Sequence, residues 1–299
     1  MTWLLLAIAA YLLFAVVSLG DRRLLLQAPE PKTYAFYVGT LGISAVLLIP
    51  FVGFFIPDLR VIGLCFLAAL FYMLFIFFMY FALERFEVSR IIPATGGFVP
   101  VITLLIVYFF IESGSLGSKE LLAFILLVSG SIAVSIDFSK IVSLKSLLIS
   151  LWIALLASLS FIFSKLVYSN VSFWPGFIWI RVIAFLLALF FIFSKTVRDD
   201  LTGKKKSFSS KNLVFFIFIQ ILGALAYILQ NWAVALAGFS FLPFINALQG
   251  IQYAFIFIIV FIVSLKLPRV FEENISTKVA LQKISAIIVM SIGFVLLAR

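Results

Sequence analysis

The chain has no histidine and a single cysteine, Cys65, among its 299 residues. Zinc sites and disulfides are built from these two residue types, and acid–base catalysis near neutral pH most often uses histidine. Their scarcity argues against a hydrolase, a metalloenzyme or a disulfide-stapled domain. We therefore expect no metal, no cofactor and no catalytic residues, and an integral membrane enzyme is the weakest of the possible functional classes.

Charge is also scarce, because only 11% of the residues are charged while 65% are hydrophobic. Soluble domains carry about 25% charged residues, so this chain cannot solvate a globular surface. Its apolar runs approach 20 residues, the length of a membrane-spanning helix. Strands are excluded because lipid offers the backbone no partner and the runs lack the period of two seen in barrels. The sequence thus predicts an all-α integral membrane protein.

Charged and turn-forming residues divide the apolar sequence into ten segments, each close to the length of a spanning helix. The predicted helices cover residues 2–19, 33–56, 60–83, 91–111, 120–136, 147–168, 175–195, 213–236, 242–266 and 279–297.

The ten predicted helices fall into two groups of five, and prolines and short turns lie at similar positions in both groups. In each half a proline-containing loop, at Pro31 or Pro175, leads into the second helix. Each half also makes a very short turn into a fourth helix that carries a proline, Pro93 or Pro243. Such internal similarity predicts two repeats. Their bounds, with the connection between them, are residues 1–138, 139–146 and 147–299.

Basic residues are concentrated in every second connection. Of the 22 lysines and arginines, 17 lie in the five odd-numbered connections and four in the even-numbered connections and at the termini. The positive-inside rule then places the odd connections in the cytoplasm and both termini outside. Corresponding loops of the two halves have opposite bias, which predicts a 5+5 inverted repeat. The basic residues behind the formal net charge of +10 set the orientation in the membrane and contact anionic lipid headgroups. We therefore expect no nucleic-acid partner.

The sequence resembles the ten-helix EamA-type branch of the drug/metabolite transporter superfamily over nearly its whole length. The residues that carry the resemblance are Tyr80-Phe81-Ala82-Leu83 continuing to Pro93 and Pro100, Glu112 before Leu121-Leu122 and Gly130, Asn231-Trp232-Ala233, and Asn246-Ala247-Leu248-Gln249. Arg181, early in the seventh helix, looks like the basic residue of the family's second and seventh helices. The chain departs from the family in two respects. Tyr37 stands where the first half of the family has a basic residue, and the charge bias places both termini outside the cytoplasm.

The resemblance implies a substrate cavity near the bilayer midplane between the two halves. Arg181 is the one charge set well inside a predicted helix, and an intramembrane charge is a functional hypothesis by default. It could hold a carboxylate or phosphate by paired hydrogen bonds, or it could snorkel to the interface.

Other polar residues form stripes on predicted helices. Gln220, Tyr227 and Asn231 share one face of the eighth helix. Asn246, Gln249 and Tyr253 share a face of the ninth, with Gly250 beside them. The first half contributes Tyr72, Thr95, Thr103 and Tyr11. We expect these side chains to line the cavity, although amides that bind helices together and tyrosines that pack or lie at the interface are the alternatives.

No aspartate or glutamate lies at the centre of a predicted helix. This predicts uniport or exchange without a carboxylate proton relay. The expected function is a transporter, not an enzyme, that moves a small metabolite such as an amino acid or another carboxylate by alternating access across a plasma or inner membrane. The alternative is a flippase for a lipid-linked carrier or a helper subunit without transport of its own. A monomer and a homodimer are both compatible with the sequence.

Overall fold

The computed structural model describes residues 2–25, 31–86, 88–111, 117–135, 143–202, 210–266 and 277–298. These residues form helices joined by short connections, and none of them lies in a strand. Seven segments are long and apolar enough to cross a membrane. The all-α prediction is therefore confirmed for the described residues, and the seven apolar segments agree with a membrane protein, whereas ten spans and a 5+5 repeat stay predictions.

The main helices are α1 (Thr2–Leu25), α2 (Pro31–Leu41), α3 (Ile49–Val52), α4 (Leu59–Arg85), α5 (Val88–Phe110), α6 (Ser118–Ser135), α7 (Leu144–Asn170), α8 (Phe173–Ala188), α9 (Lys195–Leu201), α10 (Ser210–Leu236), α11 (Leu242–Ala247), α12 (Gln249–Lys266) and α13 (Thr277–Ala298). Three 3₁₀ segments accompany them: η1 (Gly42–Leu48), η2 (Leu189–Phe193) and η3 (Phe239–Phe241).

Two predicted helices of the first half need correction. The helix predicted over 33–56 changes to 3₁₀ geometry at Gly42 and ends at Val52. Pro50 lacks the N–H that would continue the preceding helix, and Gly53 leaves helical geometry with φ of 68°. The helix predicted over 91–111 begins earlier, at Val88, and runs unbroken through Pro93 and Pro100 as α5.

The second half also departs from the predicted bounds. The helix predicted over 175–195 changes to 3₁₀ geometry after Ala188, and the short helix α9 follows within a predicted loop. The helix predicted over 242–266 is divided at Leu248 into α11 and α12. Near this break the hydroxyl of Tyr11 donates to the carbonyl of Ile245, the group that an unbroken helix would offer to residue 249.

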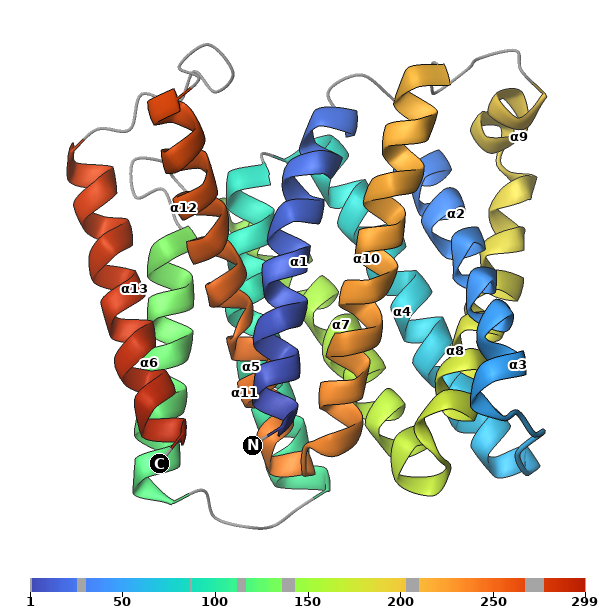
Figure 1. Ribbon diagram of the computed structural model, residues 1–299, viewed down its shortest axis with the longest axis horizontal. Helices are drawn as coiled ribbons and strands as arrows, with labels where there is room; N and C mark the ends of the chain where they lie inside the picture. The colour runs from blue at the N-terminus through green and yellow to red at the C-terminus, as the bar shows by residue number, and fades with distance from the viewer. Residues whose placement is uncertain are drawn as a thin grey trace.

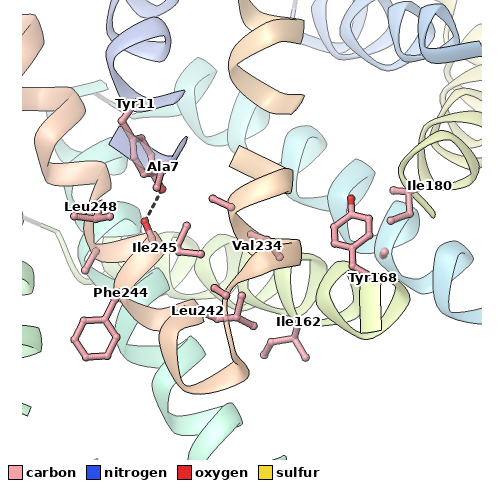
Figure 2. Close-up of a cluster of buried hydrophobic side chains, with 14 of the residues drawn as sticks. Ala7, Tyr11, Ile162, Tyr168, Ile180, Val234, Leu242, Phe244, Ile245 and Leu248 are labelled. Carbon is pink, nitrogen blue, oxygen red and sulfur yellow. Dashed lines mark hydrogen bonds between the residues drawn. The ribbon is translucent and has the colours of Figure 1, made fainter. Parts of the chain in front are cut away.

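The helices pack as pairs of neighbours from the two halves of the chain. The most extensive contacts join α6 to α13, α1 to α10 and α4 to α7. Figure 1 shows both termini at one end of the bundle and α9 at the other. The buried apolar cluster of Figure 2 fills the interior where α1, α7, α8, α10 and α11 meet.

Glycines allow two helix contacts to be close, that of α2 with α8 and that of α6 with α13. A Cβ atom added at Gly39 would lie 2.6 Å from the Cβ of Ala188, and one added at Gly130 would overlap the side chain of Met290. Both glycines therefore serve close packing of neighbouring helices.

Candidate functional site

Arg181 lies in the third turn of α8 and is only 6% exposed. Its Cζ atom is 3.8 Å from the ring centroid of Tyr227 on α10, 4.4 Å from that of Tyr72 on α4 and 5.7 Å from that of Phe177 on its own helix. Ring faces attract a guanidinium electrostatically, and the attraction strengthens when water is excluded. We call these four residues, together with Tyr168 and Asn231, the arginine cluster.

The tyrosine rings leave part of the guanidinium uncovered. Their centroids are 5.7 Å apart, less than the sum of their distances to Arg181, so they do not sandwich it from opposite faces. The Nε and Nη2 atoms of Arg181 have no hydrogen-bond partner among the described residues. These two nitrogens share one edge of the guanidinium. A carboxylate can accept hydrogen bonds from both at once along such an edge.

Two further polar side chains complete the arginine cluster. The Tyr168 hydroxyl donates to Oδ1 of Asn231 over 2.9 Å, and Nδ2 of Asn231 donates to the carbonyl of Tyr227 over 2.9 Å. Asn231 is 2% exposed, so the cluster is closed to its surroundings. Among the described residues found around Arg181, the partners are aromatic rings and tyrosine hydroxyls, and none carries a formal negative charge.

A second polar group lies where α1, α5, α10 and α11 meet, and we call it the amide seam. The Tyr11 hydroxyl donates to the carbonyl of Ile245 over 2.8 Å (Figure 2) and accepts from Nε2 of Gln230 over 3.2 Å. Nδ2 of Asn246 donates to the Thr103 hydroxyl over 2.9 Å. The seam therefore joins helices through hydrogen bonds that its own members make.

The amide seam continues along α12 toward the start of α5. Nε2 of Gln249 donates to the Tyr253 hydroxyl over 3.2 Å, and a Cβ atom added at Gly96 of α5 would lie 3.1 Å from that hydroxyl. Thr95, beside Gly96, is buried with its hydroxyl unpaired among the described residues, as is Oδ1 of Asn246.

The predicted site residues therefore divide into two groups. Arg181, Tyr72, Tyr227 and Asn231 lie together in the arginine cluster, and that they line a substrate cavity stays a prediction. The residues that the structure places in or beside the amide seam are Tyr11, Thr103, Asn246, Gln249, Tyr253 and Thr95.

Two residues of the predicted stripes lie elsewhere. Gln220 is half-buried and lies about 10 Å from Tyr227 along α10. Gly250 packs against Met290 and Ser131, because a Cβ atom there would lie 2.5 Å from the Met290 sulfur.

Sequence reasoning missed Tyr168, Phe177 and Gln230. Tyr168 stands near the end of α7, where a tyrosine is typical of the membrane interface. Gln230 is next to Asn231 but about 100° away around the helix, so it fell off the predicted stripe. A buried glutamine in an apolar helix was itself a signal, since such a group needs a hydrogen-bond partner.

Metal-ligating residues do not gather in the described part of the chain. No group of three or more histidine, cysteine, aspartate or glutamate side chains there could hold a metal ion. Cys65 is buried in the apolar core of α4.

Comparisons with known proteins add evidence on the fold. No family model matches the chain, and no curated protein matches it either. Solved structures do match it. One, described only as "Crystal structure of protein", is 11% identical, aligns over 99% of each chain and has a TM-score of 0.71. At this identity the likeness shows a shared fold and carries no functional information.

Proposed function

We propose that the protein is a ten-helix membrane transporter of the EamA type, built as an inverted repeat of residues 1–138 and 147–299. It moves a small organic anion, such as an amino acid or another carboxylate, by alternating access. The basic odd-numbered connections face the cytoplasm and both termini face outward.

The packing of the helices supports the repeat. If α1 and α4 correspond to α7 and α10, the pair α1–α10 becomes the pair α7–α4, and both are among the most extensive contacts. The pair α6–α13 maps onto itself in the same way. The 3₁₀ segments η1 and η2 also follow α2 and α8, the second helix of each half. Inverted repeats of this kind bind substrate between their halves.

The free edge of Arg181 is the observation that carries the substrate class. A buried cation without a counter-ion is costly in a membrane, and such residues persist where function needs them. Because Nε and Nη2 form one paired donor edge, the missing partner is an anion with two acceptor oxygens, a carboxylate or a phosphate.

An aromatic cluster separates Arg181 from the end of the bundle where the termini lie. The rings of Phe173 and Trp232 are stacked with centroids 5.0 Å apart, and Trp174 packs edge-on against Trp232 at 5.2 Å. Phe173 also lies 5.5 Å from Phe177, whose ring faces Arg181. Alternating access requires this cluster to open for substrate to pass on that side.

The test is the thermal stability of the detergent-purified protein with added amino acids, other carboxylates, sugar phosphates, amines and isoprenoid phosphates. A ligand at 100 times its Kd stabilises the folded protein by about 2.7 kcal/mol. We expect a soluble carboxylate or phosphate to do so, and Arg181→Ala to abolish the effect. Stabilisation by isoprenoid phosphates alone would contradict the proposal and indicate a flippase. Exchange of the labelled stabilising ligand across the membrane of protein-containing liposomes measures transport directly.

A further inference from the structure

An apolar groove of about 270 Å³ lies on the lipid-facing side of the bundle, away from the arginine cluster. It lies between α4 and the junction of α8 with η2, and its lining includes Leu74, Phe77, Leu187, Phe190 and Phe191. No polar side chain is part of its lining. The groove therefore suits a hydrocarbon chain.

Charged residues stand at one end of this groove. Phe77 also borders a small recess whose other walls are Lys32, Phe81 and Glu84. The guanidinium of Arg85 lies 3.9 Å above the ring of Phe81. Lys32, Glu84 and Arg85 are all exposed, so two cations and one carboxylate meet at the mouth of an apolar groove.

The spacing of these residues matches one leaflet of a bilayer. Leu74 and Arg85 are about 16 Å apart along α4, and half of a hydrocarbon core is about 15 Å. Lys32 is one turn from Tyr37, whose hydroxyl donates to Asp200 of α9 over 2.6 Å. The mouth thus lies at the α9 end of the bundle, opposite the termini in Figure 1.

We propose that this groove binds one phosphatidylethanolamine molecule of the adjacent leaflet. An acyl chain fills the groove, Lys32 and Arg85 contact the phosphate, and Glu84 accepts hydrogen bonds from the ammonium. Phosphatidylcholine has no ammonium hydrogens to donate, and phosphatidylglycerol has no cation for Glu84. Charge complementarity at the mouth therefore selects the ethanolamine headgroup.

The lipid site is independent of the proposed transport site. At 100° per residue, Leu74 and Tyr72 lie about 160° apart around α4, so the groove and Arg181 are on opposite sides of that helix. A change at Arg181 leaves lipid binding intact, and a change in the groove leaves anion binding intact. Failure of one proposal is thus distinguishable from failure of the other.

Native mass spectrometry of the detergent-purified chain tests this proposal. The protein is mixed with equimolar phosphatidylethanolamine, phosphatidylglycerol and phosphatidylcholine of matched acyl chains. We expect one retained phosphatidylethanolamine, favoured about fivefold over the other two lipids, as one surface charge contact allows. Equal retention of all three lipids, or of none, overturns the proposal.

Three variants sharpen this test. Leu74→Trp fills the groove and removes the adduct, whereas Leu225→Trp, at a position 47% exposed on α10, retains it. Glu84→Gln abolishes the preference for phosphatidylethanolamine without abolishing lipid binding. An adduct unchanged by Leu74→Trp overturns the proposal, and if that variant does not fold, an adduct unchanged by Lys32→Gln does the same.

Discussion

The arginine cluster and the amide seam are both buried and polar, but they differ in whether their charge and hydrogen bonds are already satisfied. In the amide seam, Tyr11 bonds to Ile245 and Asn246 bonds to Thr103. In the arginine cluster, the Arg181 guanidinium carries a full positive charge, and its Nε and Nη2 atoms have no hydrogen-bond partner among the described residues. The amide seam also has two unpaired oxygens among the described residues, at Asn246 and Thr95, but an unpaired oxygen of a neutral group costs far less than an uncompensated charge.

This difference separates helix packing from ligand binding. Hydrogen bonds between membrane helices contribute about 0.6 kcal/mol each, so the amide seam is explained by holding α1, α5, α10 and α11 together. The ring contacts of Arg181 are worth about 0.5–2 kcal/mol each, but neither the rings nor the hydroxyls of Tyr72 and Tyr227 supply a negative charge to offset the burial of the guanidinium. We therefore propose that a bound anion completes the arginine cluster.

Replacing Arg181 gives the largest expected effect on binding. Arg181→Ala removes two charge-assisted hydrogen bonds, each worth about 1.5–3 kcal/mol, so affinity for the carboxylate falls at least about 100-fold. Titration calorimetry with the ligand found by thermal stabilisation measures the change. Thr103→Val, in the amide seam, is the matched control and keeps affinity within about threefold. Equal losses in the two variants would erase the distinction between the two groups.

Arg181→Lys separates charge from geometry. Lysine keeps the positive charge but cannot present two fixed parallel donors, so we expect affinity about tenfold below that of the native protein. The same calorimetric titration at two salt concentrations checks it. Native affinity in this variant would show that a point charge suffices and that the free edge is irrelevant.

The ring of Tyr227 holds the guanidinium in place. Tyr227→Leu removes a cation–π contact worth about 0.5–2 kcal/mol, and affinity drops about fivefold. Tyr227→Phe keeps the ring and loses only the hydroxyl that contacts Arg181 and Asn231, so we expect a smaller loss of affinity than in Tyr227→Leu. A larger loss in Tyr227→Phe than in Tyr227→Leu would instead assign the hydroxyl to the ligand.

The smallest effect is expected in the amide seam. Tyr11→Phe loses the bond to the Ile245 carbonyl and the bond from Gln230, and at about 0.6 kcal/mol each this lowers the free energy of unfolding by about 1.2 kcal/mol, with ligand affinity unchanged. Thermal unfolding in detergent and ligand titration of the same preparation measure both quantities. Reduced affinity at native stability would move Tyr11 into the binding site.

Much of the fold follows from composition and helix length. Among the described residues, seven segments are long and apolar enough to cross a membrane, as apolar runs near 20 residues predict. The division at Leu248 could not be predicted, because it accompanies a hydrogen bond from Tyr11, a residue 234 positions away from Ile245. The helix α9 was missed because its charges were read as a loop, although Val197 is fully buried.

The candidate site was predicted in part for a similar reason. Helical periodicity placed Tyr227 and Asn231 on one face, and the structure brings both to Arg181. The same periodicity could not say whether Asn246 faces a cavity or another helix, since that depends on where Thr103 of α5 lies. Tyr168 of α7 contacts Asn231 of α10, and the sequence around Tyr168 alone does not predict a contact with another helix.

The stability of Arg181→Met without ligand tests the central claim most directly. Replacing an uncompensated buried charge by an apolar side chain of similar length removes a desolvation cost. We therefore expect the ligand-free variant to unfold at a temperature no lower than the native protein does, and to show no stabilisation by the carboxylate. A variant several degrees less stable than the native protein that still responds to the ligand would contradict the account and make Arg181 a structural residue.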